Sequence, residues 1–262
     1  MPGFLLKYVK RIIHQDDMNS FLKRHGDKTS LAFVEAVIDE FKANIIYEGL
    51  ENIPASGGCI VASNHPLGGL DAVALIHTIA KKRTDLKFVV NDVLLQLKNL
   101  EELFIGVNKH GKNSAQVFAQ MDKLYASEVA MLIFPAGLVS RKQSNGEIKD
   151  LEWKKSFVRQ SRKNEHDIIP VYIEGQNSGF FYNFARWRTR LGIKANIEMF
   201  YLVNEMYHQK DKLIKIIFGK PLSHKIFTRE KTEYQWAQLV KEHVYTLGRG
   251  GESPLTAYGA GH

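Results

Sequence analysis

The chain has 262 residues, 44% of them hydrophobic, which is enough for one large domain with a substantial core. Its 36 lysines and arginines outnumber 28 aspartates and glutamates, and the formal net charge of +8 suits an anionic partner such as a phospholipid surface, an acidic protein or a nucleic acid. The single cysteine, Cys59, excludes an intramolecular disulfide, and no apolar run reaches the length of about 18 residues that a membrane span needs. Both features are typical of a cytoplasmic protein.

Residues 1–40 are predicted to form a helical lead-in, because the segments 2–15 and 31–43 repeat apolar residues at intervals of three and four. Residues 41–250 alternate short apolar runs with helical patterns, which predicts one α/β domain with a mostly parallel central sheet covered by helices. Residues 251–262 are expected to form a flexible tail. The predicted strands are 44–49, 59–63, 86–90, 103–107, 129–135, 167–173, 196–203 and 213–219, and the predicted helices after the lead-in are 71–82, 93–100, 114–126, 178–192 and 232–247.

The segment "IVASNHPLGGLDAVAL" places His65 between the strand 59–63 and the helix that opens near Asp71. This is the carboxyl end of a strand, where α/β sheets bind their ligands. On one continuous helix the six residues from His65 to Asp71 would advance about 600° and separate the two side chains by about 120°. The intervening proline and glycines instead favour a tight loop, in which Asp71 caps the helix and folds back onto one ring nitrogen of His65. The alternative is that Asn64 and Asp71 are only turn and cap residues.

Four segments of the chain resemble, in order and approximate spacing, the conserved blocks of the glycerolipid and lysophospholipid acyltransferase superfamily. The first, "NHPLGGLD", resembles the NH-x4-D signature of that superfamily, and the others are "LFIGVNKHGKN", "IFPAGLVSRK" and "IIPVYIEG". The resemblance covers about residues 45–219. The first block together with "FPAG" and the following "SRK" looks most like the hemolysin-like branch, which includes the O-acyltransferases of ornithine and glycine lipids.

The resemblance implies an O-acyltransferase that moves a fatty acyl group from a thioester, on acyl carrier protein or coenzyme A, to the hydroxyl of a lysolipid, with no bound cofactor. His65 would act as general base and Asp71 would orient its ring. Cys59 lies in an apolar run and is expected to be a core residue, and ten dispersed histidines predict no metal site. The substrate-binding residues that the resemblance implies are Asn64, Asn108, Lys109, Phe134, Pro135, Ala136, Gly137, Ser140 and Arg141.

Three departures from the superfamily pattern concern the acceptor and the loop. Five residues separate His65 from Asp71 where the pattern has four, Ala136 stands where a glutamate is usual, and Lys109 stands where an arginine usually binds the acceptor phosphate. Because lysine replaces a bidentate arginine poorly, the pattern favours a lyso-aminolipid, whose carboxylate Lys109 or Arg141 could meet. The alternatives are a lysophosphatidate acyltransferase of phospholipid synthesis, a thioester hydrolase and a catalytically inactive lipid-binding protein.

Two segments combine aromatic or aliphatic residues with basic ones, the N-terminal helix and the stretch 178–192. This composition predicts peripheral contact with an anionic membrane, at the inner face of the cell membrane. The alternative for 178–192 is a partly buried helix with a basic edge. A nucleic-acid-binding protein could share the composition. It would leave the His-Asp block and the "FPAG" turn unexplained, so no nucleic-acid partner is expected.

Overall fold

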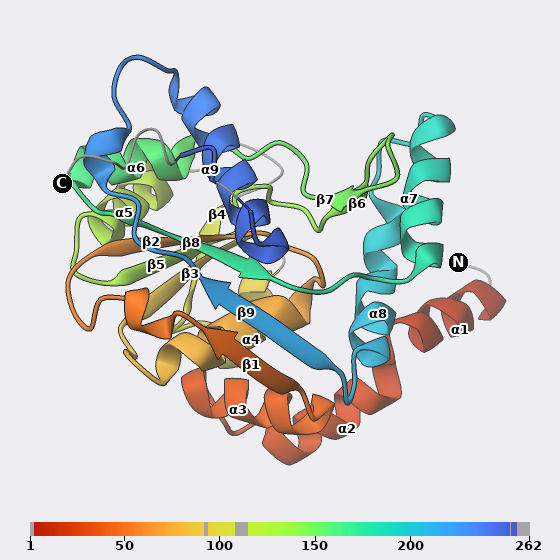
Figure 1. The fold of residues 1–262 in the computed structure, drawn as a ribbon. Coiled ribbons are helices and arrows are strands. Elements are labelled where there is room, and N and C mark those ends of the chain that lie inside the picture. The colour runs from red at the N-terminus through yellow and green to blue at the C-terminus, as the bar shows by residue number, and fades with distance from the viewer. Residues whose placement is uncertain (1–2, 92–93, 108–114, 252, 256–262) are drawn as a thin grey trace.

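Figure 1 shows the computed structural model of the chain, which describes residues 3–91, 94–107, 115–251 and 253–255. Its centre is a seven-stranded sheet in the order β1-β9-β8-β2-β5-β3-β4. The strands are β1 Asn44–Glu48, β2 Cys59–Ser63, β3 Leu86–Asn91, β4 Phe104–Val107, β5 Ala130–Ile133, β8 Ile168–Ile173 and β9 Leu213–Phe218, and a separate short hairpin is formed by β6 Arg141–Lys142 and β7 Ile148–Lys149.

The α-helices are α1 Gly3–Ile12, α2 Gln15–His25, α3 Ser30–Phe41, α4 Gly69–Ala80, α5 Ala115–Tyr125, α6 Ser156–Asn164, α7 Gly179–Arg190, α8 Leu202–His208 and α9 Glu233–Arg249. Short 3-10 turns are η1 Leu50–Asn52, η2 Leu94–Gln96, η3 Lys98–Leu100, η4 Ile197–Tyr201 and η5 His224–Ile226. Among the residues described, no helix is both long and apolar enough to cross a membrane.

Five adjacent strands, β8, β2, β5, β3 and β4, run parallel, which confirms the predicted mostly parallel sheet. The other two, β1 and β9, are parallel to each other, and β9 pairs antiparallel with β8. All five residues of β2 are buried, as expected for a central strand covered on both faces. The carboxyl ends of β2, β5 and β8 therefore lie side by side at one edge of the sheet.

Helices cover both faces of the sheet (Figure 1). An apolar layer lies between the sheet and the helices on each face. Alternate residues of the strands point to each face, so Val61 packs in the layer under α3 and α4, whereas Ile60 packs in the layer under α5, α6 and α9. Helix α3 is part of the first layer through buried residues such as Phe33 and Phe41. In the segment expected to be a flexible tail, Leu255 is buried in the second layer, and residues 252 and 256–262 lie outside the described part of the chain.

Two sequence-based assignments of secondary structure are wrong. The strand predicted at 196–203 is η4 followed by the start of α8, because Glu198 is fully buried against arginines while Phe200 is largely exposed. A strand would have put these two side chains on one face. The helix predicted at 93–100 consists of the 3-10 turns η2 and η3 in its described part. Leu94, Leu95 and Leu97 lie exposed, whereas Leu100 is buried in the core. Leu95 lies close against Gly106, so the apolar spacing does not come from a helix face.

Candidate active site

The loop between β2 and α4 makes the reversal that the sequence predicts. Gly68 has φ +96° and ψ −121°, a backbone conformation that L side chains rarely adopt, and a Cβ there would lie 3.3 Å from the side chain of Leu202. Helix α4 begins at the next residue, and Asp71 caps its first turn. The extra residue of the loop is thereby accommodated, and Asp71 returns toward His65.

His65 and Asp71 are hydrogen-bonded, with 2.9 Å between Nδ1 of the ring and Oδ2 of the carboxylate. Asp71 is fully buried, and its carboxylate also accepts the backbone N–H groups of Leu67 at 2.9 Å, Gly68 at 3.2 Å and Ala72 at 2.8 Å. These bonds fix the position of the carboxylate. No described residue is hydrogen-bonded to Nε2 of His65, and the side chain is 17% exposed, so the second ring nitrogen can meet a substrate.

Phe134, from the turn after β5, stacks on the ring of His65 with centroids 4.0 Å apart and planes 14° from parallel. Phe134 is itself held edge-on by Phe88, whose centroid is 5.0 Å away. The stack restricts rotation of the imidazole and covers one of its faces. The resemblance predicts that Phe134 binds substrate, and the structure places its ring against that of His65.

A second buried carboxylate, Asp150, fixes the backbone of the histidine loop and was missed by the sequence analysis. It accepts the backbone N–H of His65 at 3.2 Å, the hydroxyl of Ser140 at 2.6 Å and the indole N–H of Trp153 at 2.9 Å. Ser140 in turn donates its N–H to the carbonyl of His65 at 2.8 Å. Burial raises the pKa of the Asp150 carboxyl. Asp150 lies outside every recognisable motif, so no local signal identifies it.

The "FPAG" turn supplies little free polar surface. Pro135 and Ala136 are buried, and Ala136, where the resemblance expects a glutamate, packs in the second apolar layer. Gly137 is exposed with φ +66°, and its N–H donates to the carbonyl of Phe134 at 2.9 Å. The segment therefore acts in this structure as a packed turn that positions Phe134 and Ser140.

Two other predicted substrate-binding residues have partners within the protein. The Asn64 amide pairs with the backbone of Ile173, accepting its N–H at 2.7 Å and donating to its carbonyl at 2.8 Å, which extends the pairing of β2 with β8. Arg141 donates to the buried Glu198 at 2.8 Å, and burial lowers the pKa of its guanidinium. The second arginine at Glu198 is Arg188, with 2.7 Å between Nε and Oε2. The binding roles of Asn64 and Arg141 stay predictions.

Asn108 and Lys109, the remaining predicted residues, lie outside the described part of the chain. Among the residues that the structure covers, no three His, Cys, Asp or Glu side chains are grouped so that they could hold a metal ion.

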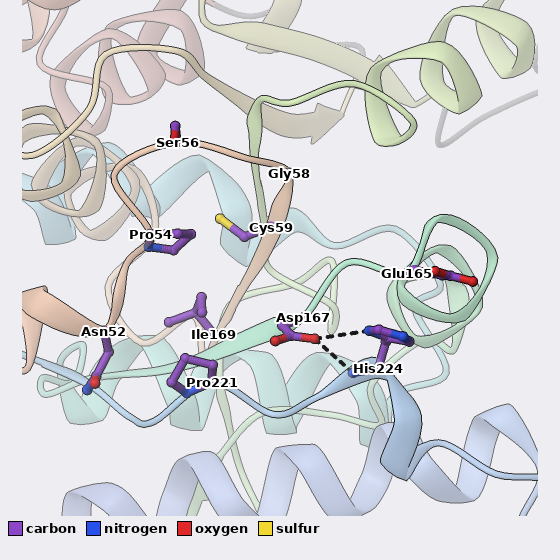
Figure 2. A pocket seen from close by; sticks show the side chains of 10 residues that line it. All are labelled: Asn52, Pro54, Ser56, Gly58, Cys59, Glu165, Asp167, Ile169, Pro221 and His224. Carbon is purple, nitrogen blue, oxygen red and sulfur yellow. Dashed lines mark hydrogen bonds and ion pairs between the residues drawn. The ribbon is translucent and has the colours of Figure 1, made fainter. Parts of the chain in front are cut away.

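A pocket of about 330 Å³ lies at the opposite edge of the sheet, by the amino ends of β2 and β8 (Figure 2). It contains a second histidine–aspartate contact, with 3.1 Å between Nδ1 of His224 and Oδ1 of Asp167. The Asp167 side chain is 45% exposed, whereas Asp71 is fully buried. Cys59 also lines this pocket, and burial raises the pKa of its thiol to about 11, which keeps it protonated at neutral pH. None of the predicted site residues lines it.

Comparisons with known proteins bear on the family and the fold of the chain. A profile of the family described as Acyltransferase matches residues 1–250. Two curated proteins named lyso-glycine lipid O-acyltransferase, from Phocaeicola vulgatus and Bacteroides thetaiotaomicron, are 44% and 42% identical over 94% of this chain, covering 88% and 91% of their own lengths. The crystal structure of the 1-acyl-sn-glycerophosphate acyltransferase PlsC from Thermotoga maritima superposes with a TM-score of 0.54 at 16% identity, covering 94% of this chain and 92% of that one, which shows a common fold. The chain therefore belongs to the acyltransferase family.

Proposed function

We propose that this protein transfers a fatty acyl group from an acyl thioester to the hydroxyl of a lyso-glycine lipid. The observation that carries the proposal is the contact between His65 and the buried Asp71 at the carboxyl end of β2, with Nε2 of the histidine available. The names of the two curated relatives support this acceptor over lysophosphatidate. The departure at Ala136 also supports this acceptor, because the glutamate that the superfamily pattern has at this position is replaced by a buried alanine.

The reaction needs a proton taken from the acceptor hydroxyl as its oxygen attacks the thioester carbonyl. Nε2 of His65 takes that proton, while Asp71 holds the N–H at Nδ1 and stabilises the imidazolium that forms. The carbon–sulfur bond then breaks, the ester carbon–oxygen bond remains, and the proton passes from Nε2 to the leaving sulfur. General-base assistance of this kind contributes about 10²- to 10⁴-fold in rate.

The donor in this proposal is an acyl thioester of acyl carrier protein or coenzyme A. Both carriers are anionic, and the net charge of +8 favours their approach. Neither requires a cofactor bound to the protein, because the thioester is consumed as a substrate.

The proposal includes peripheral contact with an anionic membrane at the inner face of the cell membrane. The supporting feature is an exposed aromatic surface, which we define as Phe4 of α1, Phe180 and Trp187 of α7, and Phe200 of η4; their exposed fractions are 77%, 54%, 55% and 58%. Phe180 packs on Tyr201 with centroids 5.0 Å apart, which joins α7 to η4.

This surface is also basic and close to the histidine loop. A hydrogen bond between Tyr8 and Tyr201 attaches α1 to η4, so direct contacts join the three elements that carry these exposed aromatic residues. Lys7, Lys10, Arg186 and Arg190 lie on the same two helices, a composition suited to a lipid head-group layer. Leu202, directly after η4, contacts Gly68, so a lipid entering here would arrive beside the proposed catalytic pair.

The test compares His65→Ala with His224→Ala, which removes the histidine of the other histidine–aspartate contact. Purified protein is assayed with acyl-acyl carrier protein or acyl-coenzyme A and lyso-glycine lipid, and the product is measured by mass spectrometry. We expect His65→Ala to lose at least about 100-fold in rate and His224→Ala to keep wild-type activity. Full activity of His65→Ala would refute the mechanism, and faster acylation of lysophosphatidate by the wild type would refute the acceptor.

A further inference from the structure

A cavity of about 210 Å³, here called the hairpin pocket, lies between the β6–β7 hairpin and the segment that leads from β8 into α7. Its lining residues are Lys142, Gly146 and Ile148 from the hairpin side, and Gln176, Asn177, Gly179 and Tyr182 from the other side. None of them belongs to the resemblance to the superfamily described from the sequence, apart from Lys142, which follows the "FPAG" turn.

Both walls of the hairpin pocket are attached to the histidine loop. Asn177 donates from Nδ2 to the carbonyl of Pro66, the residue after His65, at 3.2 Å. On the hairpin side, Ser140 donates to the carbonyl of His65 immediately before β6 begins. A molecule in this pocket is therefore held next to the loop that carries the proposed general base.

The pocket offers one anion-binding side and one hydrogen-bond acceptor. Lys142 is exposed and forms no ion pair with any residue that the structure describes. The hydroxyl of Tyr182 accepts the N–H of Asn177 at 2.9 Å, and burial raises its pKa to about 12, so it keeps a proton to donate. Asn177 is 4% exposed, and its Oδ1 has no hydrogen-bond partner among the described residues. A buried carbonyl without a partner is unfavourable, and a ligand N–H would satisfy it.

We propose that the hairpin pocket binds the N-acylglycine head group of the acceptor, with the carboxylate at Lys142 and the Tyr182 hydroxyl and the amide N–H at Oδ1 of Asn177. This inference rests on the proposed function, because it names the head-group site for that acceptor. A glycine amide carries its N–H two bonds from the carboxylate carbon, so one head group can present both groups to the pocket, whose two walls carry the cation Lys142 and the acceptor Oδ1 of Asn177. A phosphate monoester offers no such N–H group.

The position also suits the reaction. In a 3-hydroxyacyl-glycine the reacting hydroxyl carbon lies five bonds from the carboxylate carbon, a reach of about 6 Å when extended. In this proposal the head group remains in the pocket and the hydroxyl extends past Pro66, which Asn177 contacts, toward His65. Arg141, which pairs with Glu198, is not needed for the carboxylate.

The experiment measures direct binding by calorimetry, which requires no turnover. The probes are N-octanoylglycine, its methyl ester, which lacks the carboxylate charge, and octanoyloxyacetate, in which an ester oxygen replaces the amide N–H. We expect the wild type to bind N-octanoylglycine about tenfold more tightly than either analogue, because each analogue loses one polar contact. In Lys142→Gln the advantage over the methyl ester disappears while the advantage over octanoyloxyacetate remains.

The matched control is Lys220→Gln, which makes the same charge change beside the pocket at the opposite edge and should bind all three probes like the wild type. Equal affinity of the wild type for the three probes would overturn the assignment. So would a ratio of the affinities for N-octanoylglycine and its methyl ester that is the same in Lys142→Gln as in the wild type. If Lys142→Gln weakens probe binding but the wild type fails to acylate lyso-glycine lipid, the pocket assignment is supported and the proposed function is refuted. If the wild type acylates that lipid and Lys142→Gln leaves the KM for it unchanged, the proposed function is supported and the pocket assignment is refuted.

Discussion

Replacing Asp71 by asparagine isolates the contribution of its charge to the histidine pair. The substitution keeps the size of the side chain, but an amide has one acceptor oxygen where the carboxylate has two. Oδ2 serves His65 and two backbone N–H groups, and Oδ1 serves the N–H of Ala72. In its better orientation the amide oxygen takes the Oδ2 position, and the NH₂ group faces the N–H of Ala72.

The magnitude follows from these contacts. One buried donor left without an acceptor costs about 1–3 kcal/mol, and for a protein of this size each kcal/mol lowers Tm by about 2–4 °C. We therefore expect Asp71→Asn to unfold about 2–12 °C lower than the wild type while remaining folded at 25 °C. The rate should fall by about 10²- to 10⁴-fold, because the amide cannot stabilise an imidazolium at His65.

The assay combines thermal unfolding with kcat and KM for acyl transfer at 25 °C. Asp167→Asn is the matched control, since it makes the same change in the exposed contact with His224 and should alter neither quantity by more than a small amount. A fall in Tm with kcat within threefold of the wild type would show that Asp71 only caps α4. That result would refute the role of the carboxylate in catalysis.

Three further predictions follow from burial and exposure. Cys59→Ala should keep full acyl transfer, because the thiol is buried and protonated at neutral pH; loss of activity without loss of Tm would instead indicate a thiol nucleophile. The double variant Phe180→Ser with Trp187→Ser should co-sediment less with anionic vesicles than the wild type does. Binding of the wild type should also decrease as salt shortens the screening length from about 10 Å at 0.1 M to about 3 Å at 1 M. Equal binding of the wild type to neutral and anionic vesicles at both salt concentrations would contradict the electrostatic part of the prediction. The folded protein holds the proton of Asp150 more tightly than the unfolded chain does, so the free energy of unfolding of the wild type should fall as pH rises from about 4 through the raised pKa. Asp150→Asn should lack this part of the decrease. Urea unfolding at pH 4 and pH 7 measures the free energy of both proteins, and an identical pH dependence in the two would refute the prediction.

The central strands and the histidine pair could be predicted because their signals are local. The strand predicted at 59–63 is β2 to the residue, since a strand buried on both faces is a continuous apolar run. His65 and Asp71 are six residues apart, and the turn chemistry between them is visible in the sequence. The antiparallel direction of β9 against β8 has no such signal, because it depends on the path of the chain between them.

The contacts that the sequence does not reveal join distant segments. Asp150 is 85 residues from His65, and Glu198 is 57 residues from Arg141. Burial of Glu198 required two arginines from other elements, and nothing within the segment 196–203 shows that its carboxylate turns inward. The apolar residues around it satisfy a strand pattern equally well, so the tertiary ion pairs decide the local structure.

Edge strand β1 has a consequence for how the chain acquires its structure during synthesis. In the described part of the chain β1 pairs with β9 alone, and that register joins residue 44 to residue 213. The ribosome therefore completes most of the polypeptide before β1 gains a neighbour, and its N–H and C=O groups meanwhile remain available to other molecules. A nascent chain interrupted before residue 213 keeps this edge open and is expected to aggregate or to require a chaperone, whereas synthesis through Phe218 closes it.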